Sequence, residues 1–213
     1  MTDRGPTPSV GGEATAVDGD AGSYLEELIA GESELAPVAL PEALVPIELA
    51  GPHLRLSGGI DLGRFRRLSD VLNHHEGQLL VHDATILRRN GTATRVTMPS
   101  IWVNPSEVTL VGQSDDASTA ASPEMVIHKE SHLLIVVTPG HTLSGEVYVP
   151  TDGVLSVFIE SSDPTFIPMT DVRTRSLADR RIVSRYPFAL LNRRHIVAAT
   201  EAAPGTLTDR RVL

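Results

Sequence analysis

The chain has 213 residues, of which 41% are hydrophobic and 21% are charged, and its formal net charge at pH 7 is −9. Such values are typical of a globular protein with one domain or two small ones. Because the chain contains no cysteine, disulfides, thiolate metal sites and cysteine nucleophiles are excluded. No apolar run approaches the roughly 20 residues of a membrane span, and residues 1–20 do not resemble a signal peptide, so we expect a cytoplasmic protein.

Residues 1–40 are predicted to form an acidic, flexible tail. Residues 1–36 contain eight acidic residues and one basic residue. The sequence SYLEELIA predicts a short amphipathic helix over residues 23–30, because Ser23 and Glu26 have the spacing of a capping box. This helix either packs on the protein's own body, stays mobile, or binds a groove on a protein partner. The apolar face that would make the partner contact consists of Tyr24, Leu25, Leu28 and Ile29.

Two segments that repeat each other follow the tail, over residues 41–112 and 125–201. Residues 113–124 between them are small and polar and predict a linker, and residues 202–213 predict a loose tail. Matched residues lie 87 apart early in the segments and 88 apart later. The pairs are Ser57 with Ser144, Gly58 with Gly145, Ile60 with Val147, Leu62 with Val149, Asp83 with Asp171, Pro99 with Pro187, Asn104 with Asn192 and Val108 with Ile196. A register kept for so long indicates an internal duplication.

Hydrophobic and polar residues alternate along both segments, which is typical of short β-strands. Each segment offers about five such strands, and turns that contain Gly or Asn separate them. Five short strands that must bury one face and protect their edges favour a small barrel. We therefore expect a mainly β fold of two tandem small β-barrels, SH3-like or Sm-like. Within it, RLSDVLN has helical spacing, whereas its counterpart VLSVFIE predicts an extended segment.

The densest group of possible metal ligands is His74, His75, Glu76 and His82. Neighbouring residues of a strand or loop point in different directions, so they rarely bind one ion together. The matching turn of the second segment contains no histidine. The one-residue shift of the repeat also falls here, and an insertion is tolerated in a surface turn rather than in a paired strand. An exposed polar turn is therefore favoured over a metal site.

No other pattern predicts a catalytic, cofactor or metal site, so we expect a protein that is not an enzyme and needs no cofactor. The sequence HKESH, residues 128–132, lacks the glutamate of HExxH and predicts a hairpin turn. Asp83 and Asp171 are interpreted as carboxylates that cap a turn or pair with arginine, rather than as a catalytic pair. Asn104 and Asn192 are predicted to start turns through their side chains.

Clustered arginines could bind phosphate groups, as in a nucleic-acid or nucleotide site. Two facts count against this alternative. Residues 37–213 carry 19 acidic and 17 basic residues, and aromatic residues make up only 4% of the chain, which leaves few platforms for base stacking. The candidate phosphate-binding residues are Arg64, Arg66, Arg67, Arg193 and Arg194.

The sequence RLSDVLN, followed by LLVHDATI and IWVNPSEVTLV, resembles a pattern of uncharacterised bacterial proteins with duplicated small β-barrels. It is also distantly similar to Sm-like and SH3-like barrels, through Asp70 and Asn73 before a strand. Asn104-Pro105 stands where the second Sm motif has Arg-Gly. The resemblance covers residues 54–111 and, more weakly, 141–199, and it implies a barrel fold.

These features favour a non-enzymatic adaptor or assembly subunit. It would bind a protein partner through residues 1–40 and form homo-oligomers through exposed barrel edges. The alternative is a nucleic-acid or nucleotide-phosphate binding module that uses the arginine clusters.

Overall fold

The computed structural model describes residues 44–52, 54–87, 95–113, 128–178 and 181–202. All of these residues belong to one compact unit, residues 39–213. The predicted tail at residues 1–40, the linker beyond Gln113 and the C-terminal tail beyond Ala202 lie outside the described residues.

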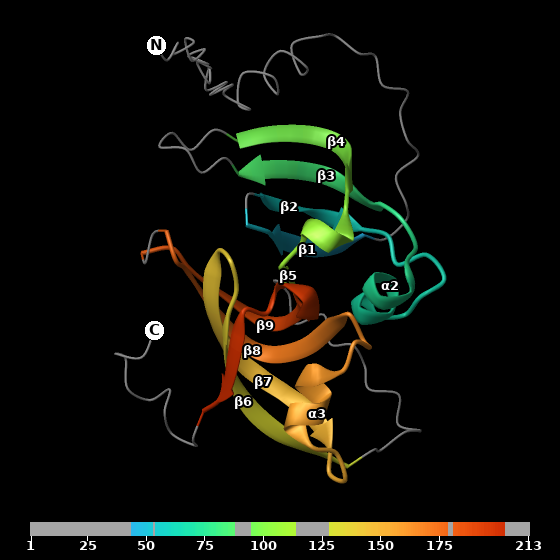
Figure 1. Cartoon of the computed structure of the whole chain (residues 1–213). Coiled ribbons are helices and arrows are strands. Elements are labelled where there is room, and N and C mark those ends of the chain that lie inside the picture. Colours follow the sequence, from blue (N-terminus) through green and yellow to red (C-terminus); the bar gives the residue numbers. More distant parts are fainter. Residues whose placement is uncertain (1–43, 53, 88–94, 114–127, 179–180, 203–213) are drawn as a thin grey trace, which may run out of the picture. The chain divides into compact units, whose positions relative to one another are not determined.

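The first half of the described chain, residues 44–113, contains five strands, one α-helix and one 3-10 helix (Figure 1). In chain order they are β1 (Val45–Ala50), β2 (Arg55–Ile60), α2 (Leu68–His74), β3 (Leu79–Leu87), β4 (Arg95–Val103), the 3-10 helix η1 (Pro105–Glu107) and β5 (Leu110–Gln113).

The second half, residues 128–202, has the same order of elements (Figure 1). They are β6 (Lys129–Val137), β7 (His141–Pro150), α3 (Leu155–Glu160), β8 (Phe166–Ser176), β9 (Val183–Asn192), the 3-10 helix η2 (Arg193–His195) and β10 (Ala198–Glu201). The ten described strands form one antiparallel sheet in the order β10-β6-β7-β8-β9-β5-β1-β2-β3-β4.

Backbone pairing in the second half follows that in the first at nearly constant sequence offsets. In β3–β4, Leu80 pairs with Trp102, and in β8–β9, Pro168 pairs with Leu190, which is 88 residues later on both strands. The β1–β2 and β6–β7 ladders match in the same way with an offset of 87 residues. The offset changes in the connections 75–78 and 161–165, between helix and strand, where the sequence predicted an inserted residue.

Both halves also share one irregularity, a bulge where the second strand meets the third. Asp83 and Asp171 lie there with φ of 48° and 50°, in the left-handed region. Asp tolerates this conformation better than most residues, and a bulge increases the local twist. Gly58 faces the bulge, where a Cβ would lie 2.6 Å from the carbonyl oxygen of His82. The conserved spacing of these residues in the two halves thus reflects a backbone requirement.

Two hydrophobic clusters form the core, one for each half, and each includes residues from the other half. Phe166 and Leu190 of the second half belong to the first cluster. Ala50 and Leu110 of the first half belong to the second cluster. Because burial of apolar area is the main stabilising contribution to folding, this exchange ties the two halves together.

Helix α2 confirms the helical spacing of RLSDVLN, since Leu68, Val71 and Leu72 are buried. The extended structure predicted for VLSVFIE is wrong, because most of this segment forms helix α3. Its valines and phenylalanine suggest a strand, but three apolar residues spaced as on one helix face pack against the second cluster. These residues are Leu155, Phe158 and Ile159.

The mainly β fold is confirmed, but two tandem small β-barrels are not. Strands β5 and β9 hydrogen-bond to each other, so the two halves share one sheet instead of forming separate barrels. Within the described residues this sheet is open, with β10 and β4 as its two edges. No helix in the described part of the chain combines the length and apolarity needed to cross a membrane.

Candidate functional site

The joint between the halves, which we define as the pairing of β5 with β9 and the side chains around it, connects the two halves into one sheet. Its ladder runs from Leu110 opposite Leu191 to Gln113 opposite Phe188. All four residues of β5 are buried. The ordinary strand pairing thus continues across the boundary between the halves.

The side chains of two asparagines hold the joint together through hydrogen bonds to backbone groups of the other half. The fully buried Asn192 donates from its side chain to the carbonyls of Pro105 (3.3 Å) and Val108 (2.9 Å). Asn73 on α2 donates to the carbonyl of Phe166 (3.1 Å) and accepts from its N–H (2.7 Å). Buried backbone groups need such partners, because an unpaired one is costly.

A polar cluster crosses the joint at the other end of β9. Arg55 forms an ion pair with Glu48 and donates to the hydroxyl of Ser184 at 2.8 Å. Burial, reinforced by the negative charge of Glu48, raises the pKa of Tyr186 to about 12. The Tyr186 ring lies across Gly112 of β5, where a Cβ would be 2.3 Å from the ring.

A third contact joins the two 3-10 helices. The His195 ring lies between the hydroxyl of Thr109, 3.1 Å from Nδ1, and the carbonyl of Ser106, 2.6 Å from Nε2. Since a neutral imidazole donates from one nitrogen and accepts at the other, the ring can satisfy both contacts when Nε2 carries the proton.

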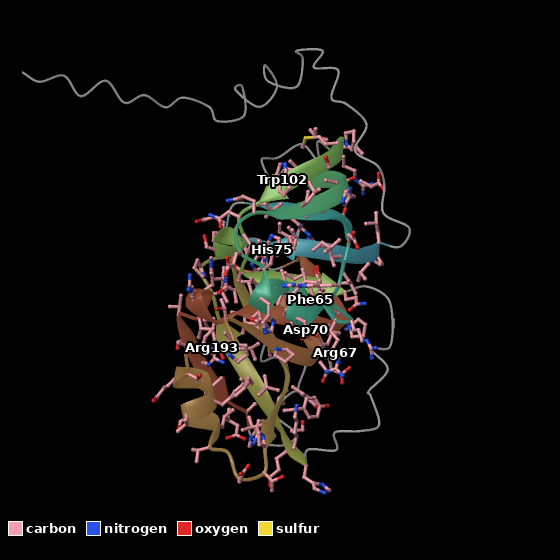
Figure 2. All side chains as sticks on the ribbon, turned by 90° about the vertical axis from the view of Figure 1, so that its right-hand side faces the viewer. Phe65, Arg67, Asp70, His75, Trp102 and Arg193 are labelled. Atoms are coloured by element: carbon pink, nitrogen blue, oxygen red, sulfur yellow. The ribbon has the colours of Figure 1, made fainter. Side chains whose placement is uncertain are left out.

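The two sheet edges are exposed although their counterparts in the joint are buried. All four residues of β10 are exposed, whereas those of β5 are buried. Trp102 on β4 is 65% exposed (Figure 2), whereas Leu190, its counterpart on β9, is 0% exposed. An exposed edge strand with a large apolar side chain is a typical protein-binding element.

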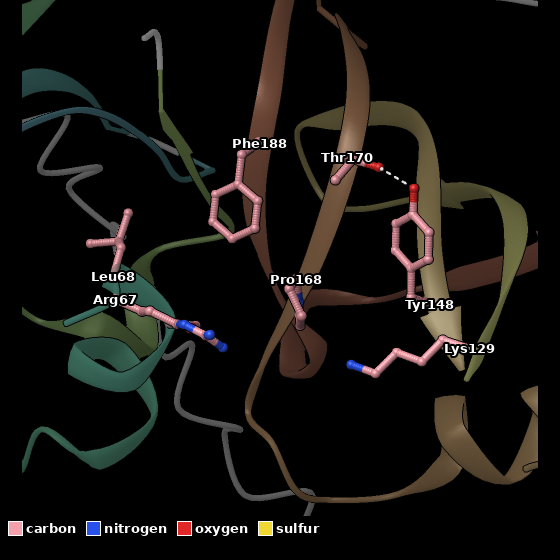
Figure 3. A pocket seen from close by; sticks show the side chains of 8 residues that line it. Arg67, Leu68, Lys129, Tyr148, Pro168, Thr170 and Phe188 are labelled. Atoms are coloured by element: carbon pink, nitrogen blue, oxygen red, sulfur yellow. Dashed lines mark hydrogen bonds between the residues drawn. The ribbon is translucent and has the colours of Figure 1, made fainter. Parts of the chain in front are cut away.

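A groove beside the joint carries two cationic side chains (Figure 3). It encloses about 240 Å³ and is lined by Arg67, Leu68, Ser69, Lys129, Tyr148, Pro168, Thr170 and Phe188. Arg67 and Lys129 point into it from opposite sides, and the Thr170 hydroxyl donates to that of Tyr148 at 3.4 Å. None of these described lining residues is acidic. The groove therefore presents two positive charges, those of Arg67 and Lys129, to an anionic ligand.

The five predicted phosphate-binding arginines have different surroundings. Arg67 lines the groove, whereas Arg64 lies over the Phe65 ring with 5.1 Å to the ring centroid. Arg66 and Arg194 are exposed. Figure 2 shows Arg193 well separated from Arg67. The predicted set is thus not gathered at one point.

Arg193 has a structural role. Its guanidinium donates to the carbonyls of Pro164 (3.0 Å), Ile159 (2.9 Å) and Phe158. Its Nη2 is buried and has no hydrogen-bond partner among the described residues. Burial lowers the pKa of Arg193, and the charge of Asp163 opposes this shift. These contacts hold the end of α3, so we do not include Arg193 in a ligand site.

The histidines do not form a metal site in the described residues, where no three His, Asp or Glu side chains are placed to share an ion. His74 and His75 contact backbone carbonyls within their own turn. His82, the fourth residue of this group, lies on β3 and is 4% exposed. The predicted hairpin turn at residues 128–132 is wrong, because His132 lies in β6 and pairs with Glu201 of β10 at 2.8 Å.

The predicted turns at Asn104 and Asn192 are present, since each side chain accepts from the backbone N–H two residues later, at 3.0 Å. The proposed partner-binding face, Tyr24, Leu25, Leu28 and Ile29, lies outside the described residues. The sequence did not point to the joint or the groove, although the contrast between Trp102 and Leu190 at matched positions was available. Comparison with family models, curated proteins and solved structures gives no match for this chain.

Proposed function

We propose that the chain is a non-enzymatic assembly subunit whose free sheet edges bind other protein chains, including copies of itself. The observation that supports this proposal most strongly is that Trp102 on β4 and all four residues of β10 are exposed, whereas Leu190 on β9 and all four residues of β5 are buried in the joint. We also infer that the two halves arose by duplication of one five-stranded unit, since their pairing repeats at offsets of 87 and 88 residues.

Edge strands favour association because their unpaired N–H and C=O groups can continue the sheet. Proteins that remain monomeric usually protect such edges with charges or cover them. Here β4 has Pro99 at its middle, but its last four residues contain no proline and no charge and include Trp102. An aromatic residue is the kind of side chain that most often anchors a protein interface. The edges thus combine backbone complementarity with an apolar anchor.

The test is the sedimentation of the full chain over a range of concentrations. We expect association that weakens at least about tenfold in Trp102→Arg, because a charge would replace an apolar anchor. The matched control is Leu177→Arg, since Leu177 is also a half-exposed apolar residue but lies outside both edges. A chain that sediments as a monomer up to its solubility limit, without binding any other protein, would overturn the proposal.

The N-terminal segment is proposed to recruit a different protein partner through its acidic charge and the apolar face of residues 23–30. Leu25→Asp with Leu28→Asp in the full chain should abolish capture of that partner while leaving self-association unchanged. Equal capture by the variant would exclude residues 23–30 as the contact.

A second candidate function, binding of a nucleic-acid or nucleotide phosphate, is favoured by the groove between Arg67 and Lys129. A labelled mixed-sequence oligonucleotide should bind with strong salt dependence. Its affinity should fall at least about tenfold in the double variant Arg67→Ala, Lys129→Ala, but little in Arg66→Ala. Binding that is equal in all variants would show that the groove is not the site.

A further inference from the structure

The joint offers a template for the contact between copies, and this inference rests on the proposed function. In the joint, the fourth strand of the second half, β9, pairs with the fifth strand of the first half, β5. The two edges of the sheet are the fourth strand of the first half, β4, and the fifth strand of the second half, β10. We propose that β10 of one copy pairs antiparallel with β4 of a second copy, in the register of the joint.

The register follows from the offset of 88 residues between the later parts of the halves. Leu110–Gln113 corresponds to Ala198–Glu201, and Phe188–Leu191 corresponds to Ser100–Val103. Ala198 of one copy therefore lies opposite Val103 of the next, and Glu201 lies opposite Ser100.

The free segments also match in length. β10 has four residues, and Pro99 precedes Ser100 on β4. Proline has no N–H to donate, so it marks the end of the stretch that can pair on that side. Pro187 occupies the equivalent place on β9, directly before Phe188, which is the last residue that pairs with β5. The same four-residue contact is thus available at the joint and at the edges.

Asn104 has a free hydrogen-bonding group at the position that this contact requires. Its counterpart Asn192 donates from the side chain across the joint and is fully buried, whereas Asn104 is exposed. The Asn104 amide oxygen accepts from Ser106, and in the described residues its amide nitrogen has no partner. In the proposed contact this nitrogen donates to the carbonyls of Arg193 and Ile196 of the next copy.

Side-chain sizes on the two edges compensate each other. In the joint, Leu190 lies opposite Val111. At the edges the corresponding pair is Trp102 and Ala199, so a larger residue on one strand meets a smaller one on the other. Directly opposite residues have Cβ atoms about 5 Å apart, which places the Trp102 ring over the small side chain. The contact would bury an aromatic group that is now 65% exposed.

The polar cluster of the joint has no charged counterpart at the two edges. The matched positions hold apolar or neutral residues, so a contact between the edges buries no unpaired charge there. Glu48, Arg55, Ser184 and Tyr186 correspond to Ile135, Thr142, Val96 and Met98, all of them half-buried. Because two of these replacements lie on the β10 side and two on the β4 side, the two surfaces match each other.

The 3-10 helices add complementary charges. His195 contacts the Ser106 carbonyl in the joint. The counterparts of these two residues are Glu107 on the β4 side and Arg194 on the β10 side, both of them exposed. The proposed contact therefore brings an acid and a base of neighbouring copies side by side. The contact uses different surfaces on the two copies, so it forms a closed ring or an extended filament.

Paired cysteines test the register directly, because the chain has no cysteine of its own. Thr200→Cys and Ile101→Cys lie opposite each other in the proposed contact, and opposite residues of antiparallel strands are close enough for a disulfide. On oxidation the double variant should form a ladder of covalent multimers, and an equal mixture of the two single variants should stop at dimers. Thr200→Cys with Thr97→Cys is the control, since Thr97 lies on the same strand but four residues away.

Charge reversal gives an independent measurement. Glu107→Arg or Arg194→Glu alone should weaken association about tenfold, and the two together should restore it to within about threefold. If the full chain associates but the ladder is absent and the reversals do not compensate, the head-to-tail contact is wrong while the proposed function stands. If copies of the full chain do not associate, the head-to-tail contact is wrong, and if the chain also binds no other protein, the proposed function fails as well.

Discussion

Replacing Asn73 tests whether the two halves are held as one structural unit. The Asn73 side chain donates to the Phe166 carbonyl at 3.1 Å and accepts from its N–H at 2.7 Å, and it is the only described side chain with a hydrogen bond from α2 to β8. Phe166 is 2% exposed, so water cannot readily take over both bonds in Asn73→Ala. Each lost bond contributes about 1 kcal/mol, and an unpaired buried backbone group costs about 1–3 kcal/mol.

We therefore expect Asn73→Ala to lower the free energy of unfolding by about 2–4 kcal/mol, a large part of the stability of a typical domain. Urea unfolding at one fixed protein concentration measures this change, and the denaturation midpoint should fall by about 1–2 M. Ser156→Ala on α3 is the control, because Ser156 is exposed and its side chain makes no hydrogen bond with another described residue. A loss below about 0.5 kcal/mol in Asn73→Ala would refute the reasoning, since that is the range of ordinary surface substitutions.

Three further changes test the joint and the bulge. Gly112→Ala should destabilise the protein by about 1–3 kcal/mol, because its Cβ would lie 2.3 Å from the Tyr186 ring, and Thr200→Ala at the matched position of β10 should be nearly neutral in the same urea assay. Between pH 10 and 12 the unfolded chain releases the Tyr186 proton and the folded protein keeps it, so the free energy of unfolding falls as pH rises, by up to about 2–3 kcal/mol. Tyr186→Phe should lose less stability than the wild type between pH 9 and 11.5, and parallel pH curves would contradict this assignment. Asp83→Val should cost about 1–2 kcal/mol because φ is 48°, whereas Asp83→Gly should cost little, and equal thermal midpoints for the two variants would exclude backbone strain.

The strands could be predicted because their signals are local. Alternation of apolar and polar residues marks a strand within a few positions, and matched pairs such as Asn104 and Asn192 mark equivalent turns. Both asparagine side chains cap the predicted turns, and in the structure each of these turns is a 3-10 helix. Helix α2 was predicted for the same reason, since the spacing of its three buried residues is visible in seven letters of sequence.

Helix α3 was missed because local preference and tertiary packing disagree there. The segment VLSVFIE is rich in β-branched and aromatic residues, which favour strands. Its helical face becomes decisive only when Leu155, Phe158 and Ile159 have a core to pack against. Propensity is a weak guide under such conditions, because burial of apolar area outweighs differences of a few tenths of a kcal/mol per residue.

The joint could not be predicted from either half alone, because strand pairing across the boundary is a non-local choice. The sequence LVGQ pairs with β1 on one side, and it does not indicate whether the other side pairs with β9 or with another chain. Once this pairing is known, differences between matched positions become informative. The position of the buried Leu190 on β9 matches that of the exposed Trp102 on β4, and the position of Val111 on β5 matches that of Ala199 on β10. Random drift of two exposed surfaces would not favour a larger residue on one and a smaller residue opposite it, whereas a contact between them would. In the register of the joint, Trp102 of one copy lies opposite Ala199 of the next, so the two residues form a single pair that experiment can test.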